Sequence, residues 1–181
     1  AVDAGVAVEA LVAGLAAALA AGRSGARVVL SELGAHLGGS AHRLQGTIDG
    51  HSVLDWVRAA EAELATMPEV KIIRRGVVFG YHDHNFLTIR ESLIDHLPLN
   101  QRQGFRERLW RVRANQVILA TGAHERPMVF GNNDLPGVML SSAMADYAQL
   151  YGVLVGQRIA LLTNNDSAYS DALTLKQAGA H

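Results

Sequence analysis

A glycine near the start of the chain has the spacing of a nucleotide-binding turn. Such turns follow G-x-G-x-x-G: the first glycine makes the tight turn, the second admits a pyrophosphate and the third lets helix and strand pack closely. The window Glu9-Ala10-Leu11-Val12-Ala13-Gly14 keeps only the third glycine. Leu11 places a side chain where the pyrophosphate would approach, and the carboxylate of Glu9 opposes binding of an anion at a helix N-terminus. Taken alone, this window predicts a poor dinucleotide site.

A carboxylate at the end of the next predicted strand favours a nucleotide site. Glu32 lies 18 residues after Gly14, and dinucleotide folds place an acid about 20 residues after the glycines to bind the ribose 2′-hydroxyl. An acid there favours NAD or FAD over NADP. From the sequence, an ordinary surface acid at a strand end is an equally good interpretation. Ser40, which follows Gly38-Gly39, is either a phosphate donor or part of a loop.

Three other polar groups carry weaker signals. His82-Asp83-His84 could place two imidazoles on one face of a strand, but no third metal ligand is evident, so a turn between strands is favoured. Thr163–Ala168 occupies a second G-x-G-x-x-G window with small polar residues, and Asp166 there disfavours a pyrophosphate. His124-Glu125-Arg126 allows acid–base chemistry, although a contact between domains is the favoured interpretation.

The charge balance argues against a nucleic-acid partner. The 181 residues contain 16 Lys and Arg and 17 Asp and Glu, for a formal net charge of -1. A balance this even gives no general attraction to nucleic acid or to an acidic surface. Five arginines and two aromatic residues lie between 102 and 113, but Arg111 and Arg113 alternate with Val112, as in a half-exposed strand. We therefore expect exposed strand positions or a subunit contact there.

Cysteine is absent from the chain. Its absence removes disulfides, thiolate catalysis and Cys-ligated metals, and it is compatible with a reducing compartment, so we expect a cytoplasmic protein. The longest apolar stretch, Ala10 to Ala21, is shorter than the roughly 20 residues of a membrane span, and we expect no membrane partner. The chain starts with Ala1 rather than Met, and we expect it to be an excerpt of a longer protein.

Hydrophobic periodicity and chain-breaking residues predict the elements. Leu11, Leu15 and Leu19 form one stripe of an Ala-rich helix, which Gly22 or Gly25 would end. We expect helices at 15–23, 53–67, 141–151 and 167–178, and strands at 26–30, 70–73, 77–81, 86–89, 108–114, 116–120 and 158–162.

These elements predict an α/β fold. Within about 30 residues the chain has an apolar segment, Gly14, a helix and a strand. This order of elements is typical of a βαβ unit with parallel strands. We expect a doubly wound, Rossmann-like parallel sheet with an inserted antiparallel β-meander at about 70–115. Residues 1–150 would form this dinucleotide-binding domain, and 151–181 would be the truncated start of a second nucleotide-binding fold.

Several longer segments carry a resemblance to a known family: Val78–Asn85, Arg106–Ala114, Val117–Pro127, Asn133–Leu140 and Thr163–Tyr169. They resemble the α subunit of heterotetrameric sarcosine oxidase. Within the two-dinucleotide-binding flavoprotein superfamily, an Ala-Thr-Gly element is widespread, whereas the Phe-Gly-Tyr-His-Asp-His-Asn and Thr-Asn-Asn-Asp runs are more specific. The resemblance covers most of the chain.

The resemblance implies a function and a set of site residues. In this family the α subunit binds NAD, FAD lies on the β subunit where sarcosine is oxidised, and FMN between subunits passes electrons to oxygen. This chain would then be the NAD-binding part of a hetero-oligomer that oxidatively demethylates a secondary amine, and it would hold no catalytic residue. The family's nucleotide contacts fall on Ala13, Gly14, Glu32, Leu33, Gly34, Ser40 and Val78, with Thr121 and Gly122 flanking the same pocket.

Two alternatives to an NAD-binding module remain open. The family has a full glycine-rich turn where this chain has Glu9 and Leu11, and polar or charged residues where Leu33 and Gly34 stand. The chain is therefore either an NAD module or a structural module with a ligand-free nucleotide site. A third interpretation is an FAD-binding subunit of a related amine or opine oxidase.

Overall fold

The chain divides into two compact units. The computed structural model describes residues 2–9 and 12–181. Unit 1 comprises Ala1–Ala41 and Leu54–Gly122, and unit 2 comprises His42–Val53 and Ala123–His181. The predicted domain boundary between residues 150 and 151 lies inside unit 2, and those domain limits stay a prediction.

Unit 1 is built on one six-stranded sheet of order β5-β2-β1-β8-β7-β6. Strand β1 pairs in parallel with β2 and with β8, and β2 pairs in parallel with β5. Strands β6, β7 and β8 form an antiparallel meander. The predicted α/β fold with a parallel sheet and an inserted meander is therefore confirmed. The strands are β1 (Val2–Glu9), β2 (Val28–Glu32), β5 (Val70–Arg74), β6 (Gly76–His82), β7 (Phe86–Ser92) and β8 (Glu107–Ile118).

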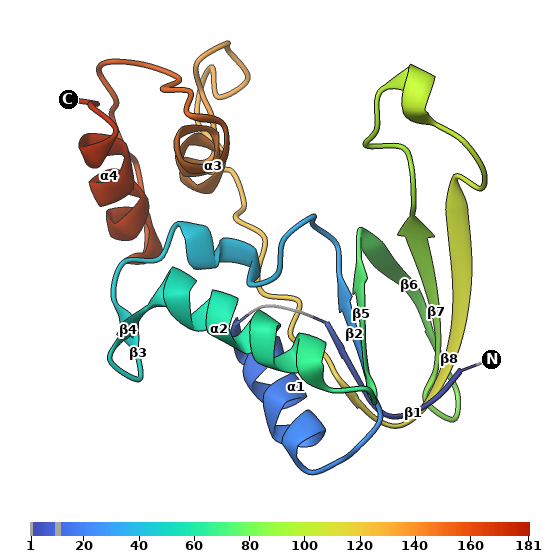
Figure 1. Ribbon diagram of the computed structural model, residues 1–181. Coiled ribbons are helices and arrows are strands. Elements are labelled where there is room, and N and C mark those ends of the chain that lie inside the picture. Colours follow the sequence, from blue (N-terminus) through green and yellow to red (C-terminus); the bar gives the residue numbers. More distant parts are fainter. Residues whose placement is uncertain (1, 10–11) are drawn as a thin grey trace. The chain divides into compact units, whose positions relative to one another are not determined.

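Two helices cover one face of the parallel strands (Figure 1). Helix α1 (Val12–Arg23) buries Leu15 and Leu19, as the predicted stripe requires, while Leu11 lies outside the described residues. Helix α2 (Val53–Thr66) is tied to the sheet by an ion pair between Glu61 and Arg74. Both helices end where the sequence predicts, to within one residue.

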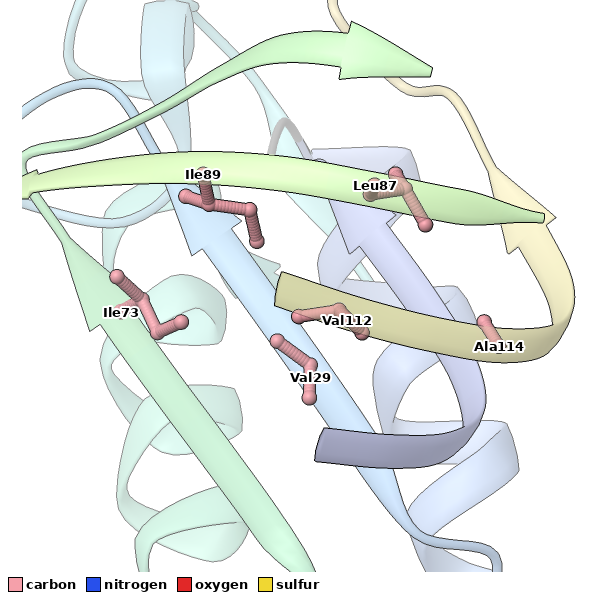
Figure 2. Packing of buried hydrophobic residues seen from close by; sticks show 6 residues of the cluster. All are labelled: Val29, Ile73, Leu87, Ile89, Val112 and Ala114. Atoms are coloured by element: carbon pink, nitrogen blue, oxygen red, sulfur yellow. The ribbon is translucent and has the colours of Figure 1, made fainter. Parts of the chain in front are cut away.

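The meander packs over the other face of the parallel strands. Val29 and Ile73 project from the parallel strands toward Leu87, Ile89 and Val112 of the meander (Figure 2). All five side chains are at most 2% exposed. Apolar surface on both faces explains why these strands have continuous apolar runs. A short 3-10 turn, Leu99–Gln101, lies in the connection from β7 to β8.

One predicted feature of the meander is wrong. We expected separate strands at 108–114 and 116–120, but β8 runs without interruption from Glu107 to Ile118. Its first half pairs with β7, and its second half pairs with β1. One long strand therefore joins the meander to the parallel sheet, and the polar pair Asn115-Gln116 is accommodated within it.

Two glycines near the end of α1 have different roles. Gly25 adopts a φ of 80°, the left-handed conformation that ends helices. Gly22 lies inside α1, and a Cβ there would approach Sδ of Met67 to 2.5 Å. Gly25 thus ends the helix as predicted, whereas Gly22 permits the close approach of the segment that follows α2.

Unit 2 contains two helices and a short hairpin. Helices α3 (Ser141–Tyr151) and α4 (Ser167–Gln177) pack around Met144, Leu175 and Ala180. The hairpin joins β3 (Thr47–Ile48) to β4 (His51–Ser52). Among the described helices of both units, none is long and apolar enough to cross a bilayer.

The predicted strand at 158–162 is not a regular strand. Its described backbone bonds to a neighbouring segment involve the last residue: the N–H of Ile159 donates to the His181 carbonyl, and the N–H of His181 donates to the Gln157 carbonyl. This is the bonding pattern of parallel strands. Two such bonds are too few for a ladder, so residues 158–162 do not form a regular strand.

Candidate functional site

The carboxyl ends of the four parallel strands meet at one edge of the sheet in unit 1. The registers place Glu9 beside Ser31, Glu32 beside Arg74, and Val8 beside Ile118. Open α/β sheets bind ligands at this edge. Most of the predicted contact residues follow directly from it: Ala13, Gly14, Glu32, Leu33, Gly34, Thr121 and Gly122.

Glu32 is the best-defined polar group at this edge. It is the last residue of β2 and is 7% exposed. The backbone N–H of Gly34 donates a hydrogen bond of 2.7 Å to its Oε1. A Cβ on Gly34 would come within 3.3 Å of the same oxygen, so glycine suits this tight turn. The carboxylate therefore has a fixed orientation at a strand end, where the ribose of a dinucleotide would need an acceptor.

The start of α1 is the second part of the candidate site. Gly14 lies buried in the first turn of the helix, and Ala13 beside it is exposed. The first turn contains no acidic residue. The two predicted obstacles cannot be placed, because Leu11 and the side chain of Glu9 lie outside the described residues.

The remaining predicted contacts occupy different surroundings. Leu33 is 62% exposed, directly after Glu32. Ser40 lies in a 3-10 turn, Gly39–His42, that follows Gly38. Val78 of β6 is partly buried against the core between the sheet and the meander. Thr121 and Gly122 are exposed after β8, and Gly122 has a φ of 72°.

The His82-Asp83-His84 segment is a turn between strands, as favoured from the sequence. His82 ends β6, and His84 has a φ of 60° in the turn that leads to β7. The two imidazoles therefore do not alternate along one strand. Within the described part of the chain, no three His, Asp or Glu side chains gather as a metal site would require.

The basic stretch forms part of β8 and the segment before it. Arg106 and Arg108 pair with Asp95 and Glu91, whereas Arg113 lies over the ring of Phe86. The hydrogen bond and charge attraction from Arg106 hold the pKa of Asp95 below its usual value despite desolvation. These contacts neutralise part of the stretch, which favours the predicted exposed strand over a nucleic-acid face.

Unit 2 contains a polar network that the sequence did not reveal. Glu125 accepts hydrogen bonds from the backbone N–H groups of Ser141 (3.1 Å) and Ser142 (2.9 Å), at the start of α3. Desolvation acts to raise the pKa of Glu125, but the hydrogen bonds from both serines outweigh it and lower the pKa. Glu125 therefore caps a helix, a role that neither the acid–base nor the domain-contact interpretation foresaw.

The same network continues to α4. The hydroxyl of Ser141 lies 2.8 Å from Oδ2 of Asp171, which is 5% exposed. Arg43 forms ion pairs with Asp171 (3.1 Å) and Asp146 (2.8 Å), and Nε2 of His42 lies 2.7 Å from Asp146. These partners come from segments far apart in the sequence, so no local spacing could have identified them.

The second predicted nucleotide-type turn is closed by its own side chains. Oδ1 of Asn165 accepts a hydrogen bond of 3.0 Å from the backbone N–H of Ser167, the first residue of α4. The hydroxyl of Thr163 donates to the Asn165 carbonyl at 2.7 Å. The side chain of Asn165 thus accepts the first N–H of α4, in the window where Asp166 is expected to disfavour a pyrophosphate.

Comparison with known proteins identifies relatives over most of the chain. No protein-family model matches it. The chain is 47% identical over 169 residues to the sarcosine oxidase subunit alpha of Corynebacterium sp. (strain P-1), and 45% identical over 166 residues to that of Rhizobium meliloti (strain 1021). Each match covers 92% of the chain but only 18% and 17% of the relative. The chain thus spans less than a fifth of the length of these relatives.

Solved structures share the fold at low sequence identity. L-proline dehydrogenase from P. horikoshii matches with a TM-score of 0.76 and 23% identity, over 98% of this chain and 34% of that one. Thioredoxin reductase from Lactococcus lactis matches with a TM-score of 0.52 and 20% identity, over 72% of this chain and 39% of that one. The chain therefore shares its fold with these two proteins. By sequence, the chain is homologous to one segment of sarcosine oxidase α subunits, which confirms the resemblance.

Proposed function

We propose that unit 1 binds NAD at the carboxyl edge of its parallel strands. The observation that carries the proposal is the buried carboxylate of Glu32, held at the end of β2 by the N–H of Gly34. Glu32 would accept hydrogen bonds from the ribose hydroxyls of the adenosine half. The first turn of α1, with Ala13 and Gly14, would face the pyrophosphate, because helix N-termini favour anions. Leu33, Gly34, Thr121 and Gly122 would flank this site.

Two other predicted contacts have weaker support. Ser40 lies in a short turn from which its hydroxyl could reach a phosphate. Val78 packs against the core and would contribute only an apolar wall. A carboxylate at position 32 also selects the cofactor, because it would repel the 2′-phosphate of NADP. We therefore expect NAD to bind more tightly than NADP.

The whole protein would be an oxidoreductase of the sarcosine oxidase type. The relatives' name supports this proposal. In such a complex a secondary amine, sarcosine, reacts with oxygen and water to give glycine, formaldehyde and hydrogen peroxide. FAD and FMN would be bound elsewhere in a hetero-oligomer and would supply the redox chemistry for oxidation of the amine. This chain would then supply nucleotide binding and subunit contacts, without a catalytic residue.

Calorimetric titration of the folded chain with NAD tests the proposed site. We expect saturable heat at micromolar to millimolar NAD and weaker heat with NADP. We also expect no flavin absorbance in the purified protein. Absence of heat at millimolar NAD, in a chain shown by circular dichroism to be folded, would contradict it. A flavin absorbance band would instead favour the FAD-binding interpretation.

Sequence features at the first turn favour a second candidate, a ligand-free structural module. Glu9 and Leu11 stand where the pattern has glycines. The double variant Glu9→Gly, Leu11→Gly separates the two functions. If the parent chain does not bind NAD and the double variant does, the site has lost its ligand and the structural role is correct.

A further inference from the structure

Arg75 occupies a position at the carboxyl edge that neither the motif nor the resemblance assigns. It is the single residue between β5, which ends at Arg74, and β6, which begins at Gly76. Because Arg74 lies opposite Glu32 in the parallel register, Arg75 follows the strand end directly beside that of Glu32. It is therefore one strand further out than Glu32, on the side away from β1.

The backbone of Arg75 is fixed to the turn that follows Glu32. Its N–H donates a hydrogen bond of 2.9 Å to the carbonyl of Gly34, and its carbonyl accepts one of 3.0 Å from Ser92. Its φ is 52°, in the left-handed region where a residue with a Cβ is strained. Glycine is the residue that such a turn favours. An arginine in a strained position at the candidate binding edge points to a role beyond the turn itself.

The neighbouring glycine does not relieve this strain. Gly76 is required for a different reason, since a Cβ there would lie 2.7 Å from Cγ2 of Ile73 and 2.8 Å from Oγ of Ser31. The turn thus uses its glycine for close packing and places arginine where the backbone is left-handed.

The guanidinium of Arg75 also lacks a carboxylate partner within the described part of the chain. The arginine before it pairs with Glu61, and Arg90 and Arg108 of the meander pair with Glu107 and Glu91. Arg75 forms no such ion pair and is half-buried. A half-buried cation without a counter-charge is available for a ligand.

The order of the strands indicates which part of a dinucleotide would meet this cation. A pyrophosphate belongs at the turn after β1, and a ribose belongs beside the acid after β2. The base attached to that ribose then extends toward β5, the next strand in the sheet. We propose that the Arg75 guanidinium stacks on the adenine ring of the bound nucleotide and so contributes to its affinity. This inference rests on the proposed function.

Planar stacking makes arginine and lysine differ at this position. A guanidinium lies flat on an aromatic face, whereas an ammonium is a point charge that keeps its hydration shell. Arg75→Gly removes the side chain and also relieves the backbone strain. Arg75→Lys keeps the charge and the strain. The two variants therefore change affinity and stability in different ways.

The experiment is a calorimetric titration of the chain and its variants with NAD and with AMP, together with thermal unfolding. Arg75→Gly is expected to weaken both ligands about 3- to 30-fold, with a Tm unchanged or raised by about 2–4 °C. Arg75→Lys is expected to lose part of the affinity. The matched control is His84→Gly, which relieves a φ of 60° in the β6–β7 turn and should leave both affinities unchanged.

Each other outcome overturns the inference in an identifiable way. If the parent chain binds NAD and Arg75→Gly binds it equally well, the stacking role is wrong while the proposed function stands. If the variant weakens NAD but not AMP, the contact is not with adenine, and the inference also fails. If Arg75→Gly does not fold, full affinity of Arg75→Lys overturns the stacking role. If the parent chain binds no NAD, the proposed function itself fails.

Discussion

The two units stabilise their elements in different ways. Unit 1 packs an apolar meander onto an apolar sheet, and Glu32 and Arg74 lie side by side at the carboxyl edge. Unit 2 has a small apolar cluster around Met144 and Leu175. Its helices are also joined by buried or half-buried charged groups, in which Asp171 contacts both Ser141 and Arg43. Apolar burial is non-directional, whereas such a network depends on each partner.

The units also differ at the starts of their helices. In unit 2, Glu125 accepts N–H groups at the start of α3, and Asn165 accepts one at the start of α4. These amide groups are therefore occupied by the chain itself and are not offered to a phosphate. In unit 1, the first turn of α1 has Ala13 and Gly14 and no acid. The contrast shows that a turn of the nucleotide-binding type can instead bind the N–H groups of its own helix. It favours unit 1 as the unit that binds a nucleotide.

The largest expected effect is on the apolar core of unit 1. Ile89→Ala removes a side chain that is 1% exposed, between the meander and the sheet. We expect a loss of about 2–5 kcal/mol in the free energy of unfolding, measured by chemical denaturation. The control is Leu109→Ala on β8, whose side chain is 61% exposed, with an expected change below about 0.5 kcal/mol. Equal losses in the two variants would contradict the apolar account of unit 1.

The second effect tests the carboxyl edge. Glu32→Ala removes the acceptor for the ribose, and we expect NAD affinity to fall about 10- to 100-fold, as for loss of hydrogen bonds to a charged group. Calorimetric titration measures the change. Glu63→Ala is the matched control, because Glu63 forms an exposed ion pair with Arg23 on α1, away from the carboxyl edge. Unchanged NAD affinity in Glu32→Ala would contradict the proposed contact between Glu32 and the ribose.

The third effect tests the network of unit 2. Ser141→Ala removes the hydroxyl that lies within hydrogen-bond distance of the carboxylates of Asp171 and Glu125. Because Asp171 is buried, we expect a loss of about 1–3 kcal/mol in the stability of unit 2, with NAD affinity unchanged. Hydrogen exchange of α3 and α4 measures that stability separately from unit 1. The control is Ser24→Ala, which removes an exposed hydroxyl bonded to the Ala21 carbonyl and should change stability little. Weakened NAD binding in Ser141→Ala would contradict the assignment of binding to unit 1 alone.

The smallest effect is on the pH dependence of unit 2. Hydrogen bonds from Ser142 and Ser141 hold the pKa of Glu125 below its usual value of 4.5 in the folded chain. A lowered folded pKa means that the stabilisation is present above pH 4.5 and disappears as the pH falls through the folded value. Glu125→Gln should therefore flatten the loss of unit 2 stability on acidification, as followed by hydrogen exchange. A steeper loss in the variant would contradict this sign.

Much of the fold was predictable, because periodic segments report burial directly. The prediction for α3 matches Ser141–Tyr151, and α2 differs by one residue at its end. The continuity of β8 was not predictable, since it depends on pairing first with β7 and then with β1, at opposite ends of one strand. The segment 158–162 has strand-forming residues, but only a ladder of partners makes a strand.

The candidate site was predictable only in its local parts. Gly14 and Glu32 lie at a fixed spacing within one βαβ unit, so sequence alone predicts that both belong to one candidate site. Arg75 joins them through a backbone bond to Gly34, 41 residues away, and Arg43 reaches Asp171 across 128 residues. Such contacts arise from the sheet order and helix packing, which no local pattern encodes.

The most direct test of the central claim is hydrogen–deuterium exchange of the chain with and without saturating NAD. The account predicts slower exchange in the first turn of α1, in residues 32–36 and around Arg75, while α3 and α4 stay unchanged. Protection confined to the start of α4, or no protection at the carboxyl edge of unit 1 in a chain that binds NAD, would contradict the account.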